Sequence, residues 1–260
     1  MERARPVKVG GKIVVVTGGG SGLGSSAAQI VRDRGAQAVV VVDRDPAHAD
    51  ITCEVGVEAQ VQATIERVLS THGRIDVWIQ NAGIGAQSST FTEDAVWQSM
   101  WDIHVMAGVY ATRHLLPHWL ERGTGHFNAV ASSNALTSNP VSAAYAATKH
   151  AELALAEWLA FTYASKGLEV SCFCPKGMRT PLLIEGAKVD AYAADALAKS
   201  VSQDEAATML VDLIESGQFL STTYPPVLDE YKLRSEDPRA YLTLMQGVHD
   251  ELVPHIGAVP

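Results

Sequence analysis

The chain has 260 residues, of which 47% are hydrophobic and 19% charged, as is ordinary for a globular domain with a sizeable core. Its formal net charge of −9 argues against nucleic acid or an anionic membrane as a partner.

Five apolar stretches alternate with longer amphipathic ones. The apolar stretches, expected to be strands, are 13–16, 38–42, 75–79, 127–131 and 169–173. The amphipathic stretches, expected to be helices, are 22–34, 57–72, 95–121 and 143–165. Near-continuous hydrophobicity within each strand is typical of a parallel sheet covered on both faces. The alternation predicts an α/β fold with a doubly wound parallel sheet, in one domain over residues 1–260.

The alternation loosens after the fifth strand. A loop and a short alanine-rich helix are expected over about 176–202, then a helix near 203–215 and a strand near 218–221. A charged tail at about 227–253 is expected to be helical. Irregular segments after a strand's carboxyl end commonly face the ligand in such folds, so we expect 176–202 to face the substrate.

A glycine-rich turn follows the first strand. Its residues are Gly18, Gly19, Gly20, Ser21, Gly22, Leu23 and Gly24. Glycines let the backbone turn tightly and approach a pyrophosphate, which then lies on the N-terminus of the following helix. A glycine-rich turn considered alone could also be a plain flexible loop. Its position between a predicted strand and a predicted helix favours a dinucleotide site.

An acidic residue, Asp43, ends the second strand 19 positions after Gly24. From there a carboxylate reaches the adenosine ribose hydroxyls and repels a 2′-phosphate, which favours NAD over NADP. Arg44 is the competing feature because it could bind that phosphate, whereas Ser21 stands where a basic residue would help. Only ten residues lie between Asp43 and Glu54, so the crossover helix after the second strand is expected to be truncated.

These motifs resemble those of the short-chain dehydrogenase/reductase family. Thr17-Gly18-x-x-x-Gly22-x-Gly24 is similar to its glycine motif, and the segment Asn81-Ala82-Gly83 is similar to its second signature. The resemblance implies a Rossmann-like fold, with the Asn-Ala-Gly segment on the adenosine side of NAD. Glu54 stands where the family usually has an aspartate near the adenine.

Tyr145 and Lys149 resemble the family's Tyr-x-x-x-Lys motif. Positions i and i+4 share one helix face, so a lysine ammonium can lie near the phenol and lower a tyrosine pKa that is ordinarily about 10. Ser132 precedes Tyr145 by 13 positions, as the family's serine does, and Ser133 is the runner-up. By resemblance, Tyr145 passes the proton, Lys149 tunes it and holds the nicotinamide ribose, and Ser132 hydrogen-bonds the substrate oxygen.

Two further segments follow the family only in part. Pro175 and Thr180 resemble the segment beside the nicotinamide carboxamide, but Lys176 replaces its usual glycine. His104 stands where the family has an asparagine whose backbone anchors a water linked to the catalytic lysine. A histidine can take over that relay or obstruct it.

Mainly apolar residues are expected to form the substrate pocket and the contacts between subunits. Side chains expected to contact the substrate, besides Ser132 and Tyr145, are Asn134, Leu136, Met178, Leu182 and Leu183. Arg179 is expected to point outward. The helix at 95–121 is apolar over more than one face, which indicates either subunit contact or burial under the C-terminal tail. The resemblance implies a homodimer or homotetramer through this helix and the helix at 143–165.

No metal site is expected. His114 and His118 share a helix face but have no apparent third ligand, so a solvated or interface pair is the better interpretation. Three cysteines without framework spacing indicate a reducing compartment, and residues 1–11 lack the apolar core of a signal peptide. No apolar run approaches the roughly 20 residues of a spanning helix. A cytoplasmic location is therefore expected.

The sequence thus predicts an NAD-dependent oxidoreductase that interconverts a mainly apolar secondary alcohol and its ketone. The alternative is an NAD-binding sensor or scaffold of the same fold without turnover, which His104 and Lys176 would favour.

Overall fold

A parallel sheet lies at the centre of the computed structural model, which describes residues 7–179, 181–188 and 191–253. Within these ranges the strand order is β3-β2-β1-β4-β5-β6-β7. The strands are β1 (Ile13–Thr17), β2 (Ala38–Asp43), β3 (Ile51–Thr52), β4 (Val77–Gln80), β5 (Gly125–Val130), β6 (Leu168–Phe173) and β7 (Leu220–Ser221). The order reverses between β1 and β4, which is where such sheets open a crevice at their carboxyl edge. The predicted doubly wound α/β class is confirmed.

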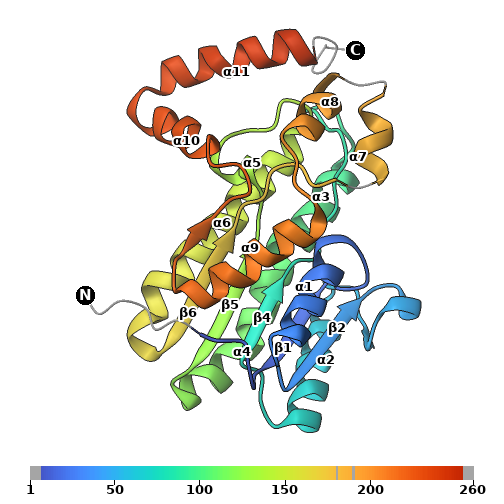
Figure 1. The fold of residues 1–260 in the computed structure, drawn as a ribbon, viewed down its shortest axis with the longest axis vertical. Coiled ribbons are helices and arrows are strands. Elements are labelled where there is room, and N and C mark those ends of the chain that lie inside the picture. Colours follow the sequence, from blue (N-terminus) through green and yellow to red (C-terminus); the bar gives the residue numbers. More distant parts are fainter. Residues whose placement is uncertain (1–6, 180, 189–190, 254–260) are drawn as a thin grey trace.

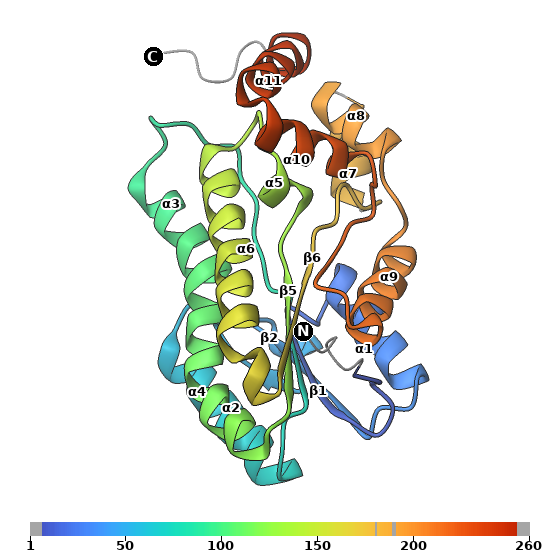
Figure 2. The same cartoon turned by 90° about the vertical axis from the view of Figure 1, so that its left-hand side faces the viewer.

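Helices cover both faces of the sheet (Figure 2). On one face lie α1 (Gly22–Asp33) and α9 (Gln203–Ser216), and on the other lie α2 (Glu58–His72), α4 (Ala107–Arg122) and α6 (Ala143–Tyr163). Side chains alternate across a strand, so Val14 and Val16 join the core under α1 and α9, whereas Val15 joins the core on the opposite face. Burial on both faces explains the unbroken apolar runs.

The connection from β2 to β3 confirms the predicted truncation. Only a 3₁₀ turn, η1 (Pro46–His48), lies between these strands, and the two-residue β3 was not predicted. The strand expected over 75–79 begins later, at Val77. Asp76 instead uses its carboxylate to accept the amide of Ile13 at 2.8 Å and to pair with Arg74 and Arg122.

The helix expected over 95–121 is interrupted. It consists of α3 (Asp94–Trp101), a π-helical turn η2 (Asp102–Met106) and α4. Single π turns inside α-helices are rare and frequently accompany functional sites. After β5 a short helix not predicted from the sequence, α5 (Ser133–Leu136), begins at the strand end. Helix α6 is followed by a 3₁₀ turn, η3 (Ala164–Lys166).

The remaining helices gather beyond the carboxyl ends of the strands (Figure 1). They are α7 (Pro181–Gly186), α8 (Ala191–Ala198), α10 (Val227–Glu236) and α11 (Pro238–Leu252). The tail expected as one helical element is two helices, because Pro238 starts α11 and Asp237 caps it by accepting the amide of Ala240 at 3.0 Å. None of the helices in the described ranges combines the length and apolar content of a membrane crossing.

Candidate active site

The glycine turn after β1 is held in close contact with the end of β4. A Cβ placed on Gly24 would lie 2.2 Å from the carbonyl oxygen of Gly18, so only glycine fits there. Asn81 Nδ2 donates hydrogen bonds to the carbonyls of Thr17 and Gly18, at 3.0 and 3.1 Å. Ser21, the N-cap of α1, makes no side-chain capping bond, which leaves N–H groups of the first turn available to an anion.

A cavity of about 330 Å³ lies against this turn. Of the residues predicted to bind the cofactor, those that line it are Gly18, Ser21, Leu23, Asp43, Arg44, Glu54, Asn81, Ala82 and Gly83. The Asp43 carboxylate accepts the amides of Gly20 and Asp45, at 3.0 and 3.1 Å. Free N–H groups at a helix N-terminus beside a glycine cradle and a carboxylate suit a dinucleotide. Gly22 is absent from the cavity wall, but its φ of 55° turns the backbone toward α1.

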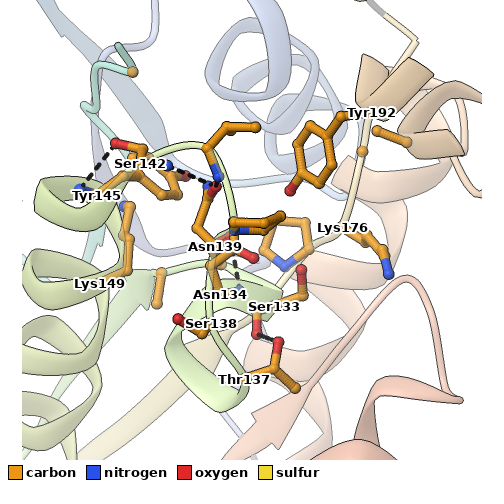
Figure 3. A pocket seen from close by; sticks show the side chains of 18 of the residues that line it. Ser133, Asn134, Thr137, Ser138, Asn139, Ser142, Tyr145, Lys149, Lys176 and Tyr192 are labelled. Atoms are coloured by element: carbon orange, nitrogen blue, oxygen red, sulfur yellow. Dashed lines mark hydrogen bonds between the residues drawn. The ribbon is translucent and has the colours of Figure 1, made fainter. Parts of the chain in front are cut away.

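A second, larger cavity of about 800 Å³ is lined by the predicted catalytic residues Ser132, Tyr145, Lys149 and His104. Ser132 follows β5 and caps α5, its Oγ accepting the amide of Asn134 at 3.1 Å, so the hydroxyl proton remains available to donate. Tyr145 and Lys149 lie one turn apart on α6, with the Lys149 Nζ 5.8 Å from the centre of the tyrosine ring. Figure 3 shows both on one side of the cavity, facing Tyr192 across it.

Lys149 is almost fully buried and doubly hydrogen-bonded. Its Nζ donates to the carbonyl of Val130 at 3.0 Å and to Glu152 Oε2 at 2.8 Å. Burial acts to lower the pKa of Lys149, but the Glu152 carboxylate, assisted by Tyr145, raises it above its ordinary value. The raised pKa favours the ammonium form next to the phenol, which is the arrangement that favours a phenolate.

The His104 ring is buried in η2, and both of its nitrogens have partners. The amide of Ile84 donates to Nε2 at 3.1 Å, so the ring proton belongs on Nδ1, which lies 2.9 Å from Thr148 Oγ1. Burial, reinforced by the charge of Lys149, lowers the pKa of His104 to about 3. The ring contacts Tyr145 edge-on, with 5.4 Å between centroids. His104 is thus a neutral packing and hydrogen-bonding group beside the tyrosine.

The other residues predicted near the nicotinamide and substrate are distributed unevenly. Pro175, Asn134, Met178 and Leu183 line the larger cavity. Leu136 does not: the α5 turn directs its side chain into the core, where it is fully buried. Thr180 and the side chain of Leu182 lie outside the described residues. Arg179 is exposed, in the orientation expected for it.

Several cavity residues were not predicted from the sequence. Met245, Val248 and Leu252 of α11 and Tyr192 of α8 line the cavity together with the predicted catalytic residues. The charged tail at about 227–253 was expected to be helical, but the sequence did not indicate which surface it would cover. Within the described ranges no three His, Cys, Asp or Glu side chains are placed to hold a metal ion.

Comparisons with known proteins identify the family of the chain. A family model described as short chain dehydrogenase matches residues 12–189. The chain is 29% identical over 198 residues to the sex determination protein tasselseed-2 of Zea mays, covering 69% of this chain and 59% of that protein. It is 29% identical over 195 residues to 3beta-hydroxysteroid dehydrogenase 2 of Eggerthella lenta, covering 68% of this chain and 75% of that protein.

A solved structure is similar over most of the chain. L-sorbose reductase from Gluconobacter frateurii, complexed with NADPH and L-sorbose, superposes with a TM-score of 0.74 at 25% identity, covering 84% of this chain and 98% of that one. The family model spans the glycine turn, the Asn-Ala-Gly segment and the Ser132, Tyr145 and Lys149 positions. The chain therefore belongs to the short-chain dehydrogenase family of oxidoreductases.

Proposed function

We propose that this protein catalyses the NAD-dependent interconversion of a mainly apolar secondary alcohol and its ketone. The observation that carries the proposal is the presence of Ser132, Tyr145 and Lys149 in one cavity at the carboxyl edge of the sheet, beside the glycine turn. When bound, the nicotinamide supplies the hydride acceptor or donor. Tyr145 exchanges the proton of the substrate oxygen, Ser132 donates a hydrogen bond to that oxygen, and Lys149 stabilises the phenolate.

The preference for NAD over NADP rests on Asp43. Its carboxylate lies in the cavity beside the glycine turn, where a 2′-phosphate would be repelled, and Ser21 supplies no positive charge there. Arg44 lines the same cavity and would favour NADP. The experiment is a titration of NADH and NADPH into the purified protein by fluorescence. Tighter NADH binding is expected, and equal or tighter NADPH binding would refute the preference.

The proposal of an apolar substrate is based on the apolar residues that line one wall of the larger cavity. Met178 and Leu183 line it together with Met245, Val248 and Leu252 of α11. Each buried methylene contributes about 0.8 kcal/mol to binding.

Two lysines that line the same cavity, Lys176 and Lys199, are engaged with protein groups. Lys199 is paired with Asp195 at 2.6 Å, and Lys176 Nζ lies 4.5 Å from the centre of the Tyr224 ring. An uncharged substrate is therefore favoured over a carboxylate or a phosphate ester.

Turnover of a series of secondary alcohols tests the activity and the substrate class together. The series runs from 2-propanol through aryl and cyclic alcohols to steroid-like ones, with NADH formation recorded at 340 nm. Specificity rising with apolar size is expected. A best substrate bearing a carboxylate or phosphate would refute the apolar pocket. NADH binding without turnover on any alcohol would favour the sensor or scaffold alternative.

We further propose that the protein forms a homodimer or homotetramer through α3, α4 and α6. Trp101, Trp158 and Phe161 of α3 and α6 are 42%, 47% and 74% exposed, which is unusual for large apolar side chains. Light scattering on the wild type and Phe161→Glu is the test. A smaller assembly is expected for the variant, and a monomeric wild type would refute the proposal.

A further inference from the structure

A buried carboxylate stands directly behind the catalytic lysine. Glu152 follows Lys149 by three positions on α6, and its side chain is only 4% exposed. Its Oε2 accepts a hydrogen bond from Lys149 Nζ at 2.8 Å. Burying two charges is costly even when they are paired, so this pair is not accounted for by packing alone. The roles given above to Tyr145, Lys149 and Ser132 make no use of it.

We propose that Glu152 is a positioning residue for Lys149: its carboxylate is the counter-ion that keeps the lysine protonated inside the fold and fixes the direction of its ammonium group. The inference rests on the proposed oxidoreductase function, and it deepens the account of that site.

The surroundings of the pair make Glu152 the source of this effect. The titratable groups that face Lys149 are Tyr145 on α6, His104 on η2 and Cys172 on β6. His104 is neutral, as described above. Cys172 is held protonated by its contact with Cys174 and by burial, which raise the pKa of its thiol well above the ordinary value. Among the described side chains around Lys149, Glu152 therefore carries the negative charge that is present before Tyr145 ionises.

The geometry shows how the pair serves the reaction. Two of the three ammonium protons of Lys149 are directed to Val130 O and Glu152 Oε2. The third remains for a ribose hydroxyl in the cavity that Lys149 lines. Burial raises the pKa of Glu152 to about 7 against the pull of Lys149, so the ion pair is complete above neutral pH, where Tyr145 must act as a base. Without the counter-charge, burial would strip the proton from Lys149 at these pH values.

The test is Glu152→Gln, which keeps the size and the hydrogen-bond acceptor but removes the charge. Glu157→Gln is the matched control, because Glu157 is an exposed residue of the same helix. Three quantities are measured between pH 7.5 and 10. The first is the ¹³C chemical shift of Lys149 Cε in the cofactor-free protein, whose signal is assigned by its loss in Lys149→Arg. The other two are the dissociation constant of NADH and kcat/KM for alcohol oxidation.

In the wild type and the control, the Lys149 signal should not titrate below pH 10, and NADH affinity should be flat. In Glu152→Gln the signal should titrate within the range. NADH binding should weaken above that midpoint, by up to about tenfold per pH unit. The rise of kcat/KM for alcohol oxidation with pH should occur at higher pH, because the group that accepts the alcohol proton has lost its neighbouring cation.

An unchanged Lys149 titration, or a pH profile of kcat/KM that is unmoved or shifted to lower pH in Glu152→Gln, would overturn the inference. If the variant does not fold, a wild-type Lys149 signal that titrates below pH 9 would overturn it equally. Absence of any alcohol turnover by the wild type would refute the proposed function instead. The Lys149 titration, measured without cofactor, would still decide the role of Glu152.

Discussion

Replacement of Gly24 by alanine is the sharpest test of how the cofactor turn is built. The added Cβ would lie 2.2 Å from the Gly18 carbonyl oxygen and 2.5 Å from Asn81 Nδ2, whereas ordinary contacts begin at 3.4 Å. The first of these is a backbone atom, so no side-chain rotation relieves the overlap. Helix α1 and the glycine turn must separate by about 1 Å.

The expected change in the free energy of unfolding of Gly24→Ala is the sum of three contributions. Overpacking in a tight contact costs about 1–3 kcal/mol, and loss of the Asn81–Gly18 hydrogen bond costs about 1 kcal/mol. The higher helix propensity of alanine relative to glycine stabilises the folded state by about 1 kcal/mol. The free energy of unfolding should therefore fall by about 1–3 kcal/mol. The displaced N–H groups of α1 should weaken NADH binding by at least about tenfold, equivalent to about 1.4 kcal/mol.

The assay is urea denaturation of the cofactor-free protein together with NADH titration by fluorescence. Gly247→Ala is the control: Gly247 also lies in a helix, α11, but its added Cβ would meet nothing within 4 Å. That variant should be as stable as the wild type or more stable, with unchanged NADH affinity. If Gly24→Ala matched Gly247→Ala in both measurements, the close packing of α1 on the glycine turn would not be what forms the cofactor site.

Three other outcomes are expected. Asp43→Ser should bring NADPH affinity closer to NADH affinity in parallel titrations; an unchanged ratio would mean that Asp43 does not discriminate between the cofactors. His104→Asn should fold and keep its activity with an unshifted pH profile, because the histidine is neutral. The hydrogen bonds to Ile84 and Thr148 should be weakened, which lowers the free energy of unfolding by about 1–3 kcal/mol in urea denaturation. A large gain in kcat would show that the histidine obstructs the relay. The pKa of His104 is about 3 in the folded protein and about 6.5 in the unfolded chain, so this residue should lower the free energy of unfolding by up to about 1.4 kcal/mol for each pH unit below 6.5. In His104→Asn the free energy of unfolding should therefore depend less steeply on pH between 6.5 and 4. Equal slopes in the two proteins would contradict a buried neutral ring.

Features encoded by local spacing were predictable. The glycine turn follows β1 and Asp43 ends β2, two strands that could be recognised from their apolar runs. The carboxyl ends of parallel strands meet at one edge of the sheet. Tyr145 and Lys149 are one helical turn apart, so their shared face follows from the periodicity of the helix. The truncated connection between β2 and β3 followed from simple residue counting.

Features that depend on tertiary placement were not predictable. Leu136 was expected at the substrate, but α5 begins at Ser133, after its cap Ser132, and directs the Leu136 side chain into the core. The prediction of a helical charged tail did not indicate that Met245 and Val248 of α11 would line the cavity. The sequence placed Glu152 one turn from Lys149. That spacing alone suits a weak surface pair, and only the burial of both side chains marks this one as unusual.

The most direct test of the central claim is NADH formation by the wild type and Tyr145→Phe on the best alcohol of the series. Phenylalanine keeps the ring against His104 and removes only the hydroxyl, so turnover should fall by at least about a thousandfold, within the range of general acid–base contributions. The dissociation constant of NADH should stay within about twofold. Retention of most of the wild-type turnover by Tyr145→Phe would contradict the assignment of Tyr145 as the proton-transfer group.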